Sequence, residues 1–453
     1  MRRDDGPGRR SEAGFTIIEM VVALFVMVEL ILAVLLLFDF SNKLSRVQSN
    51  VADMQQSLRV SQYDTVRLVR MVGRGGLPVG PLTATGADAN ATATLSGVAV
   101  SVRDNVPATA TIAGAGTPQV VAGSDVLTVR GVFSTPVYQI ATTAGAFNVN
   151  LVAGTGTLVI SATAPNASTG VSGGIPQPLD ALVTAVNTNV LEPLLLVSPA
   201  NDSLYAVVEL DPTNPLTDVS KPTVGITIGF RFLGGVRTAA YNTLSAGGAF
   251  PPALTSVTSV GILEEYRVYV RSFSNNPPGG AATAEDKAAA LNAKLSRART
   301  FPASNDPYGP GTAPGFVPAN AANLSLDVAD DVIDLQVALG FDSPLPGTVL
   351  APLSITATTA TAIVDTADAA DDWLFNSTAD VPINNLANWN AAPLYYIRLN
   401  TLVRTDRPDP KYTAPLVVGI EDNSYAASAF NVGKNLMFRR RLLQTVIDLR
   451  NAS

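Results

Sequence analysis

The apolar positions of this sequence begin with one long run near the N-terminus. Residues 15–38 form a 24-residue stretch that is apolar apart from Thr16, Glu19 and Glu29. As a helix this stretch would measure roughly 36 Å, which is enough to cross the ~30 Å hydrocarbon core of a bilayer. Because arginines precede it in residues 1–14, we expect the N-terminus to lie in the cytoplasm and the rest of the chain to be exported.

The helical pattern continues beyond this apolar stretch. No Gly or Pro occurs in the 58 residues from Phe15 to Val72, and a glycine-rich segment then ends the run. One stripe of apolar or small residues recurs at a spacing of three or four: Leu44, Val47, Val51, Met54, Leu58, Ser61, Thr65, Leu68 and Val72. The stripe predicts that residues 39–72 form an amphipathic helix packed on a globular domain of the same chain. A coiled coil is the alternative, although the stripe weakens after Leu58.

The remainder of the chain, residues 73–453, alternates short apolar runs with turn residues, which predicts a mostly β domain. The strand-like runs are 126–132, 137–141, 158–161, 204–210, 223–232, 266–273, 332–339, 395–403 and 442–449. The alternation is clearest from Tyr266 to Arg271, where one face is polar. Two Pro- and Gly-rich insertions are expected near 274–320 and 342–391, and the first is expected to hold a short helix over 284–298.

Composition limits the chemistry that the chain can perform. None of its 453 residues is Cys or His, so disulfides, thiol chemistry and histidine-based acid–base or zinc sites are excluded. A metal would need oxygen ligands, as calcium and magnesium do. The 30 basic and 37 acidic residues give a net charge of -7, whereas phosphate-backbone binders usually carry a basic excess. We therefore expect no enzymatic activity, no cofactor and no nucleic-acid partner.

Three further motifs allow more than one interpretation. Residues 170–174 match G-x-S-x-G, but a nucleophile elbow needs a histidine base, so we expect no catalysis there. Two groups of aspartates could supply oxygens to calcium, or could form a solvated loop or the first turn of a helix. These groups are Asp327, Asp330, Asp331 and Asp334, and Asp365, Asp368, Asp371 and Asp372. The basic residues 439–441 are expected near a strand edge, where charge discourages aggregation; a subunit or DNA contact is the alternative.

The acidic residue near the start of the apolar stretch distinguishes three explanations of that stretch. An ordinary secretory signal would have a shorter apolar region and a small-residue cleavage site after it. A plain signal anchor gives no reason for Glu19, because a carboxylate in a membrane is costly. The segment Gly14-Phe15-Thr16-Ile17-Ile18-Glu19 lies between a short basic leader and a single apolar helix. In this position it resembles the class III signal of type IV prepilins and pseudopilins.

This resemblance implies a set of processing and assembly residues. Residues 1–14 would be a leader that a prepilin peptidase removes between Gly14 and Phe15, and Phe15 would be N-methylated. Cleavage would leave 439 residues, which is 453 minus 14. Glu19, the fifth residue of the mature chain, would pair with the N-terminal amine of a neighbouring subunit. The physics agrees, because a carboxylate paired in a low-dielectric bundle is tolerated and a lone one is costly.

A second carboxylate, Glu29, departs from the usual pilin pattern. It follows Glu19 by ten residues, which places it about 15 Å further along the helix and near mid-bilayer. One explanation is that Glu29 stays protonated or hydrogen-bonds inside a helix bundle. The other is that it is a second intramembrane pairing point that selects a particular neighbouring subunit.

A second resemblance extends through the head. The end of the predicted helix, residues 53–76, is similar to the helix end of PilW-type minor pilins. Similar segments follow in the same order at 123–131, 328–337, 402–405 and 439–451. The resemblance implies a pilin-like lollipop of the α+β class. In it, a helix that is transmembrane over 15–38 and amphipathic over 39–72 packs on a mostly antiparallel β head over 73–453, with long insertions.

Together these features predict a minor pilin of a type IV pilus that takes part in assembly initiation or in a tip complex. The expected partners are prepilin peptidase, other minor pilins, the major pilin and the inner-membrane assembly platform. The expected location is the inner membrane before assembly and the pilus or cell surface afterwards. One alternative is a J-type pseudopilin of a type II secretion system. Another is an adhesin that a pilus displays and that binds a surface through the insertions.

Overall fold

The computed structural model describes most of the predicted elements. The described residues are 16–79, 83–85, 94–96, 99–106, 119–121, 123–133, 135, 137–161, 193–198, 204–211, 226–232, 250–273, 292–300, 325–341, 373–375, 394–421, 423–425 and 431–449. The chain divides into two compact units, Met1–Asp53 and Met54–Ser453. Each unit is described by itself below.

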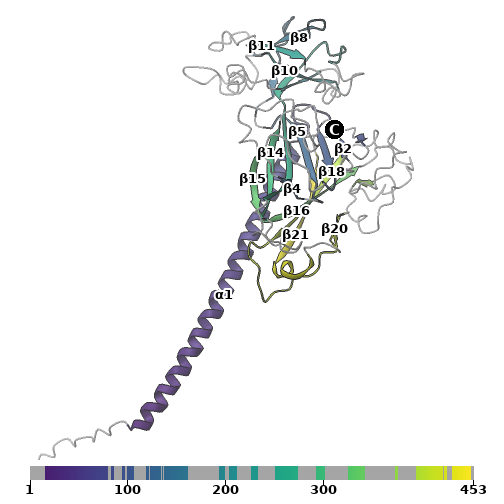
Figure 1. The fold of residues 1–453 in the computed structure, drawn as a ribbon. Helices are drawn as coiled ribbons and strands as arrows, with labels where there is room; N and C mark the ends of the chain where they lie inside the picture. The colour runs from purple at the N-terminus through teal and green to yellow at the C-terminus, as the bar shows by residue number, and fades with distance from the viewer. Residues whose placement is uncertain are drawn as a thin grey trace, which may run out of the picture. The chain divides into compact units, whose positions relative to one another are not determined.

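Helix α1, Ile17–Arg70, is continuous and confirms the long helix predicted from the sequence (Figure 1). Its residues 17–46, in the first unit, are exposed throughout, and residues 17–38 are apolar apart from Glu19 and Glu29. By length and composition, α1 is the one helix among the described residues that could cross a membrane. The stretch predicted as a membrane helix is therefore helical, and its apolar side chains are exposed in the part of the chain that the structure describes.

In the second unit, the predicted stripe of α1 is buried. Met54, Leu58, Ser61, Thr65, Leu68 and Val72 are all at most 7% exposed. The hydroxyl of Ser61 donates a 2.8 Å hydrogen bond to the carbonyl of Leu58, so this small polar residue is satisfied inside the interface. The stripe continues in sequence to Leu44, but that residue is 47% exposed and belongs to the first unit.

A glycine turn ends α1. Gly73, Gly75 and Gly76 all have positive φ, at 72°, 96° and 88°, a region that L-residues with a Cβ rarely occupy. A Cβ on Gly75 would lie 2.7 Å from the side chain of Val132, and one on Gly76 would lie 2.9 Å from Val197. The turn is therefore packed between two strand segments and has no room for side chains.

The first sheet, sheet A, is antiparallel in every pairing and contacts α1 through an ion pair from β14. Its order is β1 (Thr83–Thr85), β2 (Thr94–Ser96), β3 (Val100–Arg103), β5 (Val126–Gly131), β13 (Glu264–Phe273), β14 (Asn292–Thr300) and β15 (Ser325–Asp330), with β4 (Gln119–Val120) also on β13. Strand β14 lies inside the insertion predicted near 274–320 and replaces the second half of the helix predicted over 284–298. That helix prediction is wrong for the described part, because β14 pairs along its length with β13 and in part with β15.

Sheet B is a separate β module inserted between β5 and β13. Its order is β6 (Tyr138–Gln139), β12 (Ser259–Ile262), β9 (Pro193–Val197), β10 (Tyr205–Leu210), β11 (Ile226–Phe232), β8 (Thr155–Ile160) and β7 (Phe147–Asn150). Ile140, just after β6, bridges to Ile160 at the end of β8, and the amide of Ser161 donates to the carbonyl of Gln139 at 2.9 Å. These contacts join β6 to β8, so six of the seven strands close into a small barrel, and β7 pairs on the outside with β8.

The barrel, which we define as residues 137–262, has its own apolar core. Its core includes four large side chains that are 0% exposed, namely Tyr138, Leu158, Leu194 and Phe230. Figure 1 shows β8, β10 and β11 grouped together. The chain enters and leaves the barrel at neighbouring points, because Gly131 at the end of β5 is paired with Glu264 at the start of β13. The sequence patterns predicted several of these strands but not that they form a closed unit.

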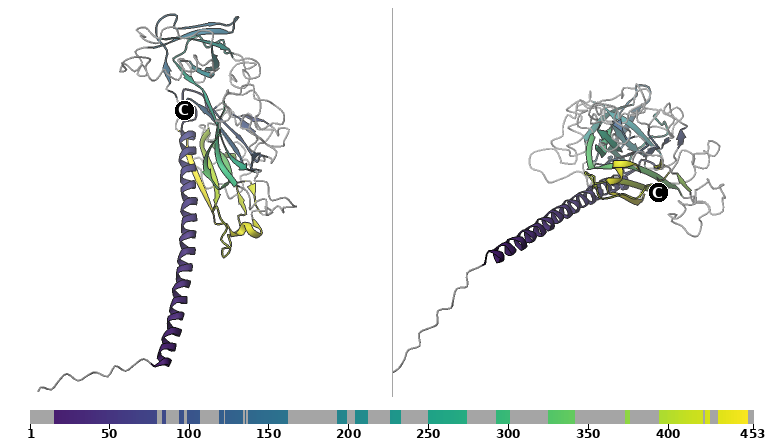
Figure 2. Two further views of the ribbon diagram at one scale, coloured as in Figure 1. Left: turned by 60° about the vertical axis from the view of Figure 1, so that its left-hand side comes forward. Right: turned by 60° about the horizontal axis from the view of Figure 1, so that its bottom comes forward.

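Sheet C has the order β17 (Trp373–Phe375), β16 (Val332–Phe341), β18 (Leu394–Arg404) and β21 (Arg440–Asp448), all antiparallel. The chain passes from β15 in sheet A to β16 in sheet C through Asp331 alone, which has a φ of 59°. Figure 2 shows sheet C beside the upper part of α1, and Gln62 Nε2 donates to Thr445 Oγ1 at 3.1 Å. The predicted strand at 442–449 is therefore an edge strand next to the helix.

Between β18 and β21, the chain forms a two-stranded hairpin and a short 3-10 helix. The hairpin consists of β19 (Gly419–Ile420) and β20 (Asn423–Ser424), and the 3-10 helix is Gly433–Met437. We call residues 418–425 the C-terminal hairpin. All nine strand runs predicted from the sequence contain a strand in the structure, so the mostly antiparallel β body is confirmed.

Candidate functional site

The predicted processing site falls at the edge of what the structure describes. Gly14 and Phe15 lie outside the described residues, which begin at Thr16. The proposed cleavage between them and the N-methylation of Phe15 therefore remain predictions.

Glu19 closes the first turn of α1 together with Thr16. The backbone N–H and the hydroxyl of Thr16 each donate to Glu19 Oε2 at 2.9 Å, and the N–H of Glu19 approaches Thr16 Oγ1 at 3.4 Å. This reciprocal arrangement is a capping box, which satisfies backbone donors at a helix start. The T-x-x-E spacing was visible in the sequence, but the resemblance drew attention to assembly and not to capping. Glu19 thus has a role within its own chain in addition to any role between chains.

Glu29 has a different environment from Glu19 and Asp39, the acidic residues on either side of it along the helix. Asp39 forms a 2.5 Å ion pair with Lys43, which lies one turn further along the helix. Both of these side chains are about 60% exposed. Glu29 is exposed and makes no hydrogen bond or ion pair with any residue that the structure describes. In a bilayer its carboxyl would need a partner from another molecule or a bound proton.

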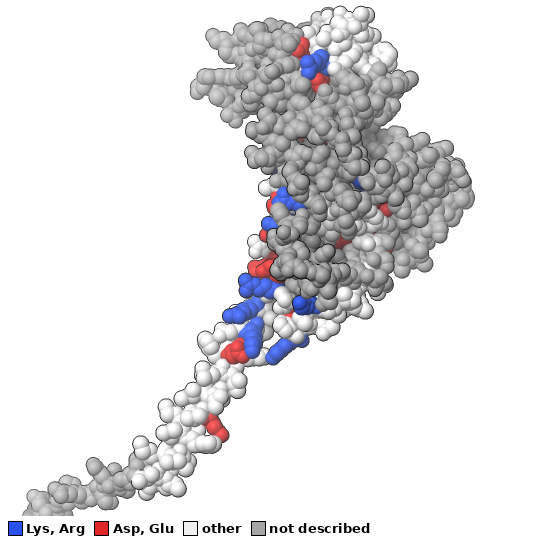
Figure 3. Space-filling view, in the orientation of Figure 1, with Lys and Arg blue, Asp and Glu red and all other residues white. Residues whose placement is uncertain are grey.

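Charge is unevenly spread along α1. In the space-filling view, the N-terminal part of the helix is almost entirely white, and Lys and Arg gather further along it (Figure 3). Arg59, Arg67 and Arg70 are exposed on the part that belongs to the second unit. Such side chains are available to acidic neighbours or to water.

An ion pair holds the second-unit part of α1 to sheet A. Arg297 Nη1 on β14 contacts both carboxylate oxygens of Asp64 on α1, at 2.7 and 2.9 Å. The same guanidinium lies over the ring of Tyr266 at 5.2 Å, and Tyr266 packs edge-on against Phe133 at 5.4 Å. These contacts connect the helix to β13 and to the segment that leads into the barrel.

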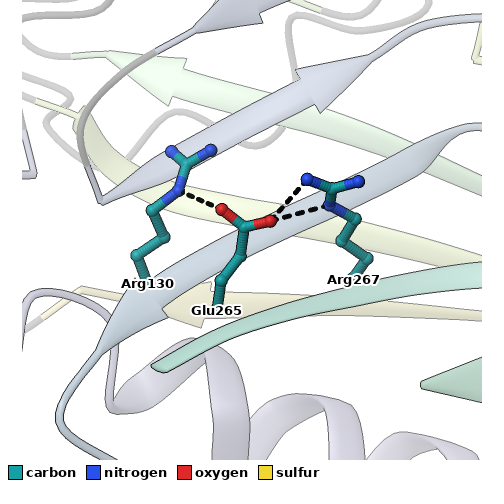
Figure 4. A network of polar contacts seen from close by, with 3 residues as sticks. All are labelled: Arg130, Glu265 and Arg267. Carbon is teal, nitrogen blue, oxygen red and sulfur yellow. Dashed lines mark hydrogen bonds and ion pairs between the residues drawn. The ribbon is translucent and has the colours of Figure 1, made fainter. Parts of the chain in front are cut away.

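The polar face predicted for β13 is not exposed to water. Glu265 is 0% exposed and accepts from Arg130 Nε at 2.6 Å and from Arg267 Nε and Nη2 at 2.8 and 2.5 Å (Figure 4). Arg267 is 4% exposed. Alternation of charged and apolar residues therefore marks a strand with two covered faces, one of which buries an Arg–Glu–Arg network. Burial of such charges is tolerated because each is paired.

The first aspartate group lies on β15 and β16 and at the junction between them, and not in a loop or at a helix start. Asp327 on β15 accepts from Arg271 at 2.7 Å and Asp330 accepts from Lys294 at 2.9 Å. Asp331 forms the sheet-to-sheet junction, and Asp334 is 3% exposed on β16. No set of three acidic side chains among the described residues is arranged to hold a metal ion. The second group, Asp365 to Asp372, lies outside the described residues.

The basic residues 439–441 at the start of the edge strand serve mainly to fold the preceding loop. Arg439 pairs with Asp409 at 3.0 Å and lies 4.2 Å over the ring of Tyr412. Arg440 Nη2 donates to the carbonyl of Asn435 at 2.7 Å. Arg441 is exposed on the strand, as predicted for a charge at an edge.

Two buried contacts anchor the C-terminal hairpin to sheet C. At its turn, Glu421 has a φ of 51° and accepts from Arg398 at 2.8 and 2.7 Å and from Asn400 at 2.6 Å. At its end, the hydroxyl of Tyr425 donates to Asp334 Oδ2. No sequence pattern indicated these contacts, because the partners are 21 to 91 positions apart.

Comparison of this chain with known protein families, with curated proteins and with solved structures finds no match.

Proposed function

We propose that this chain is a minor subunit of a type IV pilus or of a closely related filament, in which it acts in assembly initiation or at the tip. The observation that carries the proposal is the apolar, unpacked part of α1, with Glu19 at its first turn. A single exposed apolar helix of this length needs an apolar environment. A bilayer before assembly and a helix bundle after assembly both provide one.

The size of the second unit supports a subunit that is present in few copies per filament. A head with an additional barrel is harder to repeat at every step of a helical lattice than a single domain of ~100–150 residues. At a tip or in a priming complex, one side of the head stays free. The expected partners are prepilin peptidase, other minor pilins, the major pilin and the inner-membrane assembly platform.

The capping box permits a sharp test of the assembly role of Glu19. Gln also fits the third helical position of a capping box, so Glu19→Gln retains the cap but removes the charge. If Glu19 pairs with an amine on another subunit, Glu19→Gln is processed and inserted but fails to co-purify with partner pilins. Glu19→Ala, which loses both features, is the matched comparison. Normal co-purification of Glu19→Gln would show that the charge has no assembly role.

A J-type pseudopilin of a type II secretion system shares the same helix and signal, and the genes next to this one would distinguish the two systems. Processing is tested separately by N-terminal mass analysis of the membrane-extracted protein. Cleavage predicts a chain that begins at Phe15, and replacement of Gly14 by a bulky residue should leave the full 453-residue precursor.

The barrel favours a second candidate function, surface binding by a displayed module. It has a closed strand order and its own core, and it joins the rest of the head at two adjacent points. Deletion of 274–320 is a poor test of adhesion, because it would remove β14 from sheet A. Replacement of residues 133–262 by a short turn between β5 and β13 is the better variant. Loss of adhesion with piliation intact would favour the binding module.

A further inference from the structure

Three aspartates meet where sheet A, sheet C and the C-terminal hairpin come together. Asp125, at the start of β5, accepts from the backbone N–H of Asn105 at 2.9 Å and of Val337 at 2.7 Å. Its own N–H donates to the carbonyl of Leu335 at 2.8 Å. Asp104 and Asp334 are the other two members, and all three are at most 3% exposed.

The C-terminal hairpin closes over this cluster. The hydroxyl of Tyr425 donates to Asp334 Oδ2, and Asn423 also hydrogen-bonds to Asp334. The side chain of Asn423 lies close to Gly123, two residues before Asp125. Removal of the hairpin would therefore expose Asp334 to water.

The contacts around Asp125 and Asp334 include no cation among the residues that the structure describes. Their neighbours are backbone N–H groups, amides, a phenol and other carboxylates. Gln336 Nε2 donates to Asp334 Oδ1 at 3.1 Å and to the carbonyl of Gly123 at 2.8 Å. Gln336 Oε1 is buried and has no hydrogen-bond partner in the described part of the chain. An excess of negative charge beside an unpartnered acceptor is the environment that a bound proton relieves.

We propose that Asp125 and Asp334 form a buried proton-binding site, and that the proton held there favours docking of the C-terminal hairpin on sheet C. This inference is independent of the proposed function.

The electrostatics of the cluster support this assignment. Burial raises the pKa of Asp334 to about 6, and the hydrogen bonds from Tyr425 and Gln336 offset only part of that effect. Burial, followed by the carboxylate of Asp104, raises the pKa of Asp125 well above its usual value. Burial also raises the pKa of Tyr425, so the phenol remains a donor.

The direction of the pH effect follows from linkage. When the hairpin opens, Asp334 meets water and its pKa returns toward the ordinary 3.8. Because the docked state has the higher pKa, docking is strongest below about pH 4 and weakens as the pH rises through about 6. For Asp334 alone, the ratio of docked to open hairpin should fall roughly tenfold between pH 5 and pH 7.

Hydrogen exchange of the full chain in detergent micelles tests this inference. After correction for the intrinsic exchange rate, protection of residues 418–425 should fall roughly tenfold from pH 5 to pH 7. Asp334→Asn is neutral at every pH and similar in shape, so it should show little change over this range. Tyr425→Phe removes a hydrogen bond that stabilises the ionised Asp334, so the wild-type transition should move to higher pH.

Two controls keep the test decisive. Glu421→Gln removes the charge that Arg398 pairs with and so weakens the other hairpin anchor. It should reduce protection at both pH values and leave the change in protection between them in place. Asp331 lies at the junction between the two sheets, and burial also raises its pKa to about 6. Asp331→Asn should leave the pH dependence of hairpin protection unchanged. Protection that stays constant or rises from pH 5 to pH 7 in the wild type would overturn the proposal. The proposal would also be overturned if protection of the hairpin in Asp334→Asn fell with pH as much as it does in the wild type.

Discussion

Asp64 on α1 and Arg297 on β14 form an ion pair across 233 positions of sequence, with both carboxylate oxygens within 2.9 Å of one guanidinium nitrogen. The two side chains are only 27% and 24% exposed. This pair connects the helix to sheet A in the second unit, and a hydrogen bond from Gln62 to Thr445 connects it to sheet C. Its strength therefore reports how firmly the helix is held on the head.

A double-mutant cycle on this pair measures that strength. We expect Asp64→Ala and Arg297→Ala to show a coupling free energy of about 1 kcal/mol in denaturant unfolding of the full chain in micelles. The Asp39–Lys43 pair is the control, because it is about 60% exposed and should show coupling near zero. Equal coupling in both pairs would mean that the sheet contributes nothing to the Asp64–Arg297 interaction.

The glycine turn after α1 offers a second prediction. Gly75→Ala should destabilise the head by about 2–5 kcal/mol, because it adds both left-handed backbone strain and a clash with Val132. Gly145 also has a positive φ, of 82°, but a Cβ there meets nothing within 4 Å. Gly145→Ala should therefore cost only the backbone strain, about 1–2 kcal/mol. Urea unfolding of both variants measures the difference, and equal effects would exclude the packing explanation.

The buried network on β13 gives a third prediction. Glu265→Ala leaves the guanidinium of Arg267 without its carboxylate partner in a position that is 4% exposed. Removal of one member of a buried ion pair costs about 3–5 kcal/mol. Glu265→Gln keeps the shape and one acceptor, so its cost should be smaller. In thermal unfolding, the wild type should be the most stable, Glu265→Gln should be less stable and Glu265→Ala should be the least stable. If Glu265→Ala were as stable as the wild type, the network would have no structural role.

Patterns among neighbouring residues predicted the helix and those strands whose formation depends mainly on their own residues. The absence of Gly and Pro and the stripe through Met54, Leu58 and Leu68 predicted α1, and alternating or apolar runs predicted nine strands. Strand β14 was missed because Asn292–Thr300 is rich in Ala, Lys and Arg, which favour a helix. Its pairing with β13 and β15 overrides that preference, and pairing partners distant in sequence are not visible in a local pattern.

The site was less predictable than the fold for the same reason. Asp334 was one of four aspartates that the sequence assigned to a solvated loop or a helix start, with calcium as the alternative, and its burial depends on Tyr425, 91 positions away. The barrel closes through Ile140 and Ile160, a contact that no periodicity indicates. Only the Thr16–Glu19 cap could have been found from spacing alone.

Glu29 gives the last prediction, which separates the two explanations of its role. A carboxylate near mid-bilayer costs about 2.5–3.5 kcal/mol if it stays charged and unpaired, and Glu29 has no partner among the described residues of its own chain. A neutral, protonated acid that hydrogen-bonds in a helix bundle avoids most of this cost. Glu29→Gln preserves a neutral hydrogen-bonding group, so we expect it to co-purify with partner pilins as the wild type does. Glu29→Leu, which inserts well but cannot hydrogen-bond, should lose a large part of that association.

The measurement is quantitative mass spectrometry of partner pilins recovered with each variant from solubilised membranes. Loss of association in Glu29→Gln as well would instead show that Glu29 is charged and pairs with a cation on a neighbouring helix.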